Sequence, residues 1–162
     1  MSAEKVKLLF VCMGNICRSP AGEGVMQSVI DDAGLSESVE IDSAGTIGFH
    51  SGDPADSRMR QAASRRGYDL TSRARKVMQK DLIQFDLILV MDEENRQDVM
   101  SMALSKEDEE KIVRFCDFCN EHEATSVPDP YYGGSEGFER VLDLLEDGCQ
   151  GILEEVQQRL NA

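Results

Sequence analysis

Residues 11–20 read Val11-Cys12-Met13-Gly14-Asn15-Ile16-Cys17-Arg18-Ser19-Pro20, and the rest of the chain is organised around them. The apolar run at residues 6–11 is typical of a strand buried on both faces. Ser19 is a good N-cap and Pro20 suits a first helical position, so we expect a helix to begin near Ser19. The segment therefore predicts a strand–loop–helix unit.

The loop between Cys12 and Arg18 has the composition of an oxyanion-binding site. It contains no proline, so every backbone N–H in it can donate. Gly14 and Asn15 are the residue types that most readily adopt left-handed backbone conformations, which lets successive N–H groups turn toward one centre. The positive end of the following helix points to the same place. We therefore expect a bound anion to be surrounded by Met13, Gly14, Asn15, Ile16, Cys17 and Ser19.

Cys12 adds a nucleophile to this anion site. A thiolate is stabilised at a helix N-terminus beside an arginine. The planar guanidinium of Arg18 can hold two phosphoryl oxygens at once, which would leave the Cys12 sulfur in line with phosphorus. A small buried cysteine at a strand end is the alternative interpretation. The Gly14-Asn15 turn and the spacing to Arg18 favour the nucleophile.

The pattern Cys12-x5-Arg18-Ser19, with its flanking residues, resembles the signature of the low-molecular-weight protein tyrosine phosphatases. The resemblance implies hydrolysis of phosphotyrosine in proteins, and of small aryl phosphates, through a cysteinyl-phosphate intermediate. It implies neither a metal nor another cofactor. Ser19 resembles the family's serine that supports the departing thiolate, and Asn15 and Ser43 resemble a hydrogen-bonded pair. Ser72 departs from the pattern, because several relatives have a histidine there that joins the loop network.

Composition limits the classes of protein to consider. The chain has 162 residues, 41% of them hydrophobic, which suits one phosphatase domain over residues 1–162. A net charge of −14 argues against nucleic-acid binding and requires a local positive site for an anionic substrate. No segment has the length of a membrane span or the layout of a signal peptide. The odd number of cysteines, five, favours a reducing compartment. We expect a cytoplasmic protein, mainly monomeric, with weak self-association through exposed tyrosines.

Strand-like and helix-like segments alternate along the chain. We expect strands at residues 6–11, 38–42, 85–91 and 111–116, and helices at 21–33, 54–66 and 135–160. A helical turn is expected at 80–82, and another helix after Asp92. This order predicts a doubly wound α/β fold, with a central four-stranded parallel sheet and helices on both faces, as in the family. The Cys12 loop, Ser43 and Asp92 each follow a predicted strand, so they should meet at one sheet edge.

A candidate general acid lies in the segment Val127-Pro128-Asp129-Pro130-Tyr131-Tyr132-Gly133-Gly134. Prolines restrict the backbone on both sides of Asp129, which suits a carboxylate that protonates the leaving group and later activates water. A proline-rich turn with exposed tyrosines is the alternative. The segment also resembles the family's acid loop. Asp92 resembles a supporting acid of the family, and a simple helix N-cap explains it equally well.

Apolar and aromatic side chains predict the choice of substrate. A phosphotyrosine ring can pack among them and reach the bottom of a deep anion site, whereas phosphoserine loses that contact. Ile16 stands where related bacterial protein-arginine phosphatases have a threonine that contacts the guanidinium. His50 reads as a surface residue. The expected walls are Met13, Ile16, Phe49, Tyr131 and Tyr132.

Three other interpretations remain. Thiol-coupled arsenate reductases share the fold and the anion loop, but the closely spaced cysteine pair they use has no counterpart between Cys17 and Cys116. A phosphate-binding module without turnover would need no acid at position 129. Cys116, Cys119 and His122 suggest zinc only weakly, since no fourth ligand is evident.

Cys17 suggests redox regulation. It lies within loop reach of Cys12, so an oxidised Cys12 could form a reversible disulfide with it and avoid over-oxidation.

Overall fold

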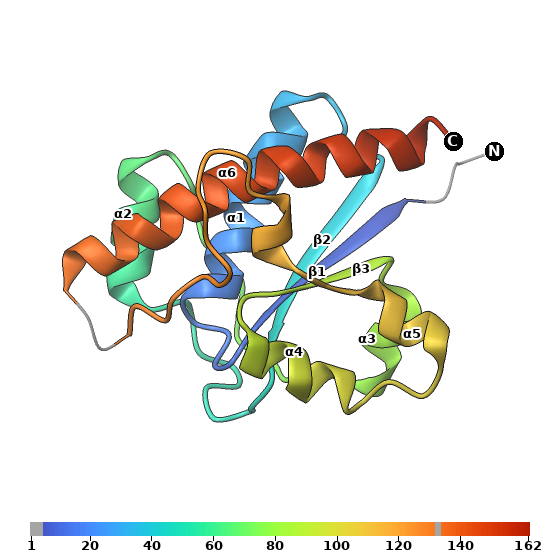
Figure 1. Ribbon diagram of the computed structural model, residues 1–162. Helices are drawn as coiled ribbons and strands as arrows, with labels where there is room; N and C mark the ends of the chain where they lie inside the picture. The colour runs from blue at the N-terminus through green and yellow to red at the C-terminus, as the bar shows by residue number, and fades with distance from the viewer. Residues whose placement is uncertain (1–4, 132–133) are drawn as a thin grey trace.

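The computed structural model describes residues 5–131 and 134–162. Four parallel strands form one sheet in the order β2-β1-β3-β4 (Figure 1). The strands are β1 (Val6–Cys12), β2 (Val39–Gly45), β3 (Leu87–Val90) and β4 (Ile112–Arg114). Helices cover both faces, which confirms the predicted doubly wound α/β fold.

The central strand β1 supplies side chains to two separate cores. Leu8 and Phe10 point into the larger core, whereas Leu9 and Val11 point into the smaller one, as the alternation of a strand requires. All four are fully buried. The apolar run is therefore a strand covered on both faces, as predicted, and it carries Cys12 to the carboxyl edge of the sheet.

The larger core lies under three helices, α1 (Arg18–Asp32), α2 (Ser57–Arg65) and α6 (Ser135–Leu160). The opposite face of the sheet carries α3 (Gln79–Gln84), α4 (Glu93–Met100) and α5 (Lys106–Lys111) (Figure 1). The bounds of α6 agree with the predicted helix. Among the described residues, none of these helices has the length and apolar character needed to cross a membrane.

Two glycines allow a short 3₁₀ helix, η1 (Phe115–Phe118), to pack closely on α6. A Cβ atom at Gly148 would overlap the Phe115 ring, and one at Gly151 would overlap the Phe118 carbonyl. The glycines weaken the intrinsic helix propensity of α6, but they permit this close approach. The helix is continuous through both.

The predicted N-cap of α1, Ser19, is wrong, although the helix does begin near that residue. The helix begins at Arg18 with Cys17 as N-cap, and no side chain caps it. Ser19 lies inside the first turn, where its hydroxyl contacts the Cys12 sulfur instead of a backbone N–H. The predicted end is confirmed, because Gly34 adopts a φ of 73° just after the helix.

The observed bounds of other strands and helices differ from the predicted bounds for local reasons. Strand β2 runs three residues further than predicted, because Ser43 to Gly45 continue the pairing with β1. Helix α2 begins at Ser57, since the Asp56 carboxylate caps it by accepting from the Arg58 N–H at 2.8 Å. The predicted fourth strand stops at Arg114, and η1 follows. Helix α5 was not predicted, although its N-cap Ser105 and acidic first turn are visible in the sequence.

Candidate active site

The loop between β1 and α1 surrounds the Cys12 sulfur with hydrogen-bond donors. Cys12 ends β1 and is only 3% exposed. The Asn15 N–H donates to Cys12 Sγ at 3.3 Å, and Ser19 Oγ lies 3.0 Å from the same sulfur. A thiolate in this position is stabilised by a backbone dipole and a hydroxyl.

Asn15 holds the loop in its curved conformation. Its φ of 58° is the only positive value of a non-glycine in the described part of the chain. Its side-chain amide donates to Ser19 Oγ at 2.8 Å and to Ser43 Oγ at 3.0 Å, and its Oδ1 accepts from the Arg75 N–H at 2.9 Å. Three partners therefore fix the left-handed residue. Gly14, the other residue expected to take such a conformation, has no positive φ.

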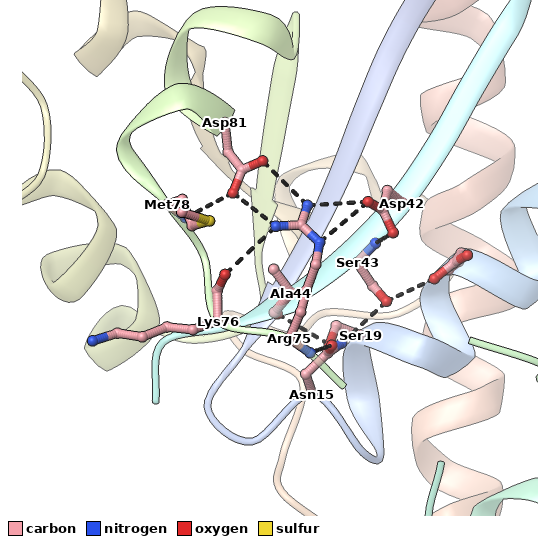
Figure 2. Close-up of polar contacts among 10 residues, drawn as sticks. Asn15, Ser19, Asp42, Ser43, Ala44, Arg75, Lys76, Met78 and Asp81 are labelled. Carbon is pink, nitrogen blue, oxygen red and sulfur yellow. Dashed lines mark hydrogen bonds and ion pairs between the residues drawn. The ribbon is translucent and has the colours of Figure 1, made fainter. Parts of the chain in front are cut away.

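Ion pairs of the Arg75 side chain in turn fix the position of the Arg75 main chain. Figure 2 shows the guanidinium between two carboxylates, 3.0 Å from Asp42 Oδ2 and 3.0 Å from Asp81 Oδ2. Asp81 is nearly fully buried, so this ion pair is shielded from solvent. The clamp fixes the backbone N–H that Arg75 directs at Asn15.

The half-buried carboxylate of Glu23 completes the support of the loop. Ser43 Oγ donates to Glu23 Oε1 at 2.6 Å, and Ser72 also hydrogen-bonds to Glu23. Burial raises the pKa of Glu23 above its usual value, more than these hydroxyls lower it. The position where several relatives have histidine is thus filled by a neutral partner of Glu23. The loop is supported by the hydrogen bond between Ser43 and Glu23 and by the Arg75 clamp.

Arg18 is buried and oriented by groups from two other segments. Its side chain is 4% exposed, and Nη1 lies 2.6 Å from Asp92 Oδ2 and 3.1 Å from the Val127 carbonyl oxygen. Burial alone would lower the pKa of Arg18, but Cys12 and Asp92 raise it, so the guanidinium stays charged. Asp92 Oδ1 also accepts the Asn95 N–H at 2.7 Å. Asp92 is therefore both a helix N-cap and a partner of Arg18.

The Asp129 carboxylate also lies near the Arg18 guanidinium. Its Oδ2 lies 3.8 Å from Arg18 Nη2, and its Oδ1 accepts the Tyr131 N–H at 3.0 Å. Arg58, which was not predicted to take part in the site, donates to the Tyr131 carbonyl at 3.0 Å and lies 5.3 Å from the centre of the Tyr131 ring. Arg58 thus anchors the acid loop to α2.

Cys12, Arg18 and Asp129 line one pocket of about 230 Å³. Asn15 and Ser19 lie behind its floor and are not among the lining residues, whereas Ile47 and His50 line it although they were not predicted to. His50 is half-buried and packs edge-on against Phe49, with 4.9 Å between the ring centres, so it is not a fully exposed surface residue. Tyr132 lies outside the described residues. The lining residues are Cys12, Met13, Gly14, Ile16, Cys17, Arg18, Ile47, Phe49, His50, Asp129 and Tyr131.

The structure also bears on the predictions made for Cys17 and for the grouping of Cys116, Cys119 and His122. Cys17 lines the pocket, and burial together with the nearby Asp56 raises its pKa, so it remains a neutral thiol beside Cys12. Within residues 5–131 and 134–162, no three His, Cys, Asp or Glu side chains are placed to hold a metal ion. The grouping of Cys116, Cys119 and His122 is therefore not supported as a zinc site.

Comparison with known proteins gives consistent matches over nearly the whole chain. The family model described as low molecular weight phosphotyrosine protein phosphatase matches residues 7–162. The crystal structure of a protein tyrosine phosphatase from Entamoeba histolytica superposes with a TM-score of 0.93 at 45% identity, covering 95% of this chain and 98% of the other. YfkJ from Bacillus subtilis superposes with a TM-score of 0.90 at 36% identity, covering 98% and 99%. The human low molecular weight phosphotyrosine protein phosphatase is 34% identical, covering 91% of this chain and 93% of its own length.

Proposed function

Because this chain belongs to the low-molecular-weight phosphotyrosine protein phosphatases, we propose that Cys12, Arg18 and Asp129 carry out its hydrolysis of phosphotyrosine. The family reaction proceeds through a cysteinyl phosphate. The observation that carries the assignment is the meeting of all three side chains in one pocket. They come from β1, α1 and the loop before α6.

In the first step the Cys12 thiolate attacks phosphorus and the bond to the phenolic oxygen breaks. Arg18 and the loop N–H groups hold the phosphoryl oxygens, whose charge they stabilise in the transition state. Asp129 gives its proton to the departing phenolate. Its position 3.8 Å from Arg18 supports this role, because a group held by Arg18 would also lie near Asp129.

In the second step water replaces sulfur. Asp129, now ionised, takes a proton from the attacking water, and phosphate forms as the bond from phosphorus to sulfur breaks. Ser19 Oγ, 3.0 Å from Cys12 Sγ, stabilises the thiolate as it is released. Asn15 and Ser43 position that hydroxyl and the loop, and Asp92 positions Arg18.

The pocket walls support an aromatic substrate. Met13, Ile47 and Tyr131 are partly exposed large side chains at the pocket, and Phe49 is 83% exposed beside it. A phenyl ring entering between them buries apolar surface that phosphoserine lacks. We propose that these side chains, with Ile16 and Tyr132, bind the phosphotyrosine ring.

A trapping experiment tests the assignment. Acid quench during turnover of a ³²P-labelled phosphotyrosine peptide should leave label on Cys12. The Cys12→Ser variant should form no labelled enzyme, yet it should still bind vanadate. Product formation by the wild-type protein without label at Cys12 would overturn the mechanism. Parallel assays with phosphoserine, phosphoarginine and arsenate should give at most weak activity, and thiol-dependent reduction of arsenate would favour the reductase interpretation.

We also propose that Cys17 protects Cys12 from over-oxidation. In this reaction a peroxide converts Cys12 to a sulfenic acid, and the Cys17 thiol displaces water from it to form a disulfide. Both residues are buried at one pocket, which supports the pairing. After peroxide treatment, mass spectrometry of the tryptic peptide 8–18 should show an internal disulfide, and sulfinic acid at Cys12 without any disulfide would contradict it.

Three further properties are proposed. Residues 1–162 would make up one phosphatase domain, because both helical layers pack on one sheet. The protein would act mainly as a monomer, since Cys12, Arg18 and Asp129 of one chain meet in one pocket, with weak self-association through tyrosines such as the exposed Tyr131. It would work in the cytoplasm, where all five cysteines, including the catalytic Cys12, stay reduced.

A further inference from the structure

A second pair of cysteines lies far along the chain from the catalytic loop. Cys116 is inside η1 and Cys119 directly follows it. The Cys119 N–H donates to the Cys116 carbonyl at 3.1 Å, which closes a four-residue turn. Such a turn keeps its first and last Cα atoms within about 7 Å, and disulfides span about 4.4–6.8 Å between Cα atoms. The backbone therefore already holds the two cysteines near bridging range.

The turn is fixed on both sides. The ring of Phe115, just before the turn, packs on Gly148, and the Phe118 carbonyl within the turn packs on Gly151, where there is no room for a Cβ atom. After the turn, the Asp147 carboxylate accepts the N–H groups of Asn120 at 2.9 Å, Glu121 at 3.0 Å and His122 at 2.9 Å. The conformation that brings the cysteines together is thus built into the fold.

The two sulfurs differ in environment. Cys116 is 6% exposed, whereas Cys119 is half-buried and its Sγ donates to the Leu144 carbonyl at 3.6 Å. A hydrogen bond with Cys119 lowers the pKa of Cys116, and the charge of Arg140 lowers it further against the effect of burial. The same hydrogen bond and burial raise the pKa of Cys119. One thiol is therefore poised to ionise while the other keeps its proton.

We propose that Cys116 and Cys119 are a second redox site, a dithiol that closes to an internal disulfide on reaction with a hydroperoxide. This site is separate from the pair of Cys12 and Cys17 and does not depend on the proposed catalytic roles. It also differs from a zinc site, since it uses two sulfurs and needs no further ligand.

The reaction balances as a two-electron oxidation. The Cys116 thiolate attacks one peroxide oxygen and the O–O bond breaks, which gives a sulfenic acid and, after protonation, water or an alcohol. The Cys119 sulfur then attacks the Cys116 sulfur, the S–O bond breaks and a second water leaves with the Cys119 proton. Both cysteines are oxidised and one peroxide is reduced. A dithiol reductant reverses the change.

The test uses the full-length Cys12→Ser variant, which removes the catalytic thiol from the chemistry. After treatment with hydrogen peroxide, free thiols are alkylated and the protein is digested with trypsin. Residues 115–140 form one tryptic peptide with Cys116 and Cys119 as its only cysteines, and Cys149 falls in the next peptide, 141–159. We expect peptide 115–140 to escape alkylation and to lose two hydrogens. Treatment with dithiothreitol after the peroxide and before alkylation should restore alkylation of both cysteines.

The double variant Cys12→Ser/Cys119→Ser is the matched control. Its Cys116 should stop at the sulfenic acid, which dimedone traps, and no internal disulfide should form. Full alkylation of both cysteines in peroxide-treated Cys12→Ser protein would overturn the proposal. So would a disulfide joining peptide 115–140 to peptide 141–159, because Cys149 would then be the partner.

Discussion

Arg18 Nη1 lies 2.6 Å from Asp92 Oδ2, although 74 residues separate the two in the chain. The contact joins the first turn of α1 to the N-cap of α4 across the carboxyl edge of the sheet. Asp92 uses one oxygen for Arg18 and the other for the Asn95 N–H at 2.7 Å. One carboxylate thus orients the anion-holding guanidinium and starts a helix.

We expect Asp92→Asn to lower kcat/KM for an aryl phosphate by about 10–100-fold. The reason is the loss of a charge-assisted hydrogen bond, worth about 1.5–3 kcal/mol. Stability should change little, because asparagine is as good an N-cap as aspartate. Steady-state kinetics and urea unfolding measure the two effects. Ser105→Ala, which removes the N-cap of α5, should instead cost about 1 kcal/mol of stability and leave kinetics unchanged.

Asp129→Ala should reduce kcat by roughly 10²–10⁴-fold, as expected for the loss of a general acid. The loss should be smallest for nitrophenyl phosphates, whose leaving groups need little protonation, and largest for phosphotyrosine. A series of aryl phosphates with different leaving groups measures this dependence. Asp53→Ala, which removes an exposed carboxylate that pairs with His50, serves as control. An equal loss for every leaving group would show that Asp129 does not act as the acid.

The half-buried Glu23 should make stability depend on pH. Its folded pKa is raised above the ordinary 4.5, so the folded protein binds the proton more tightly than the unfolded chain. This contribution to stability is complete below about pH 4.5 and is lost as the pH rises through the folded pKa. The free energy of unfolding of wild type minus that of Glu23→Gln should therefore fall with rising pH in urea titrations.

The exposed Glu40 provides the comparison for Glu23. Glu40→Gln should show no such fall over the same pH range. A difference between wild type and Glu23→Gln that rises with pH would mean that the Glu23 carboxylate is stabilised in the folded protein.

Gly151→Ala should destabilise the protein although alanine favours helices. Its Cβ would overlap the backbone carbonyl of Phe118, and such overpacking typically costs about 1–3 kcal/mol. The helix propensity gained, at most about 1 kcal/mol, offsets only part of this cost. Gly137→Ala in the same helix meets only Pro130 at 3.5 Å, an ordinary contact, and should be neutral or stabilising. Urea unfolding of both variants distinguishes the two effects, and equal stabilities would refute the tight packing of η1.

Local patterns in the sequence predicted most of the elements and the loop at the centre of the candidate site. The apolar run before Cys12 predicted β1, Gly34 predicted the end of α1, and Asp92 predicted the start of α4. These signals work because backbone conformation and capping depend on residues within one or two turns. The spacing of Cys12 and Arg18 likewise predicted the anion loop, since a short loop can place both ends around one group.

Several contacts between distant side chains became visible only in the tertiary structure. Ser19 has the composition of an N-cap, but its hydroxyl contacts Cys12 because the loop folds back over it. Nothing near Arg75 in the sequence indicates that its N–H holds Asn15, 60 residues away. Arg58 supports the acid loop over a similar separation. Such pairings depend on the strand order and on how the helices pack on the sheet, which short-range preferences do not encode.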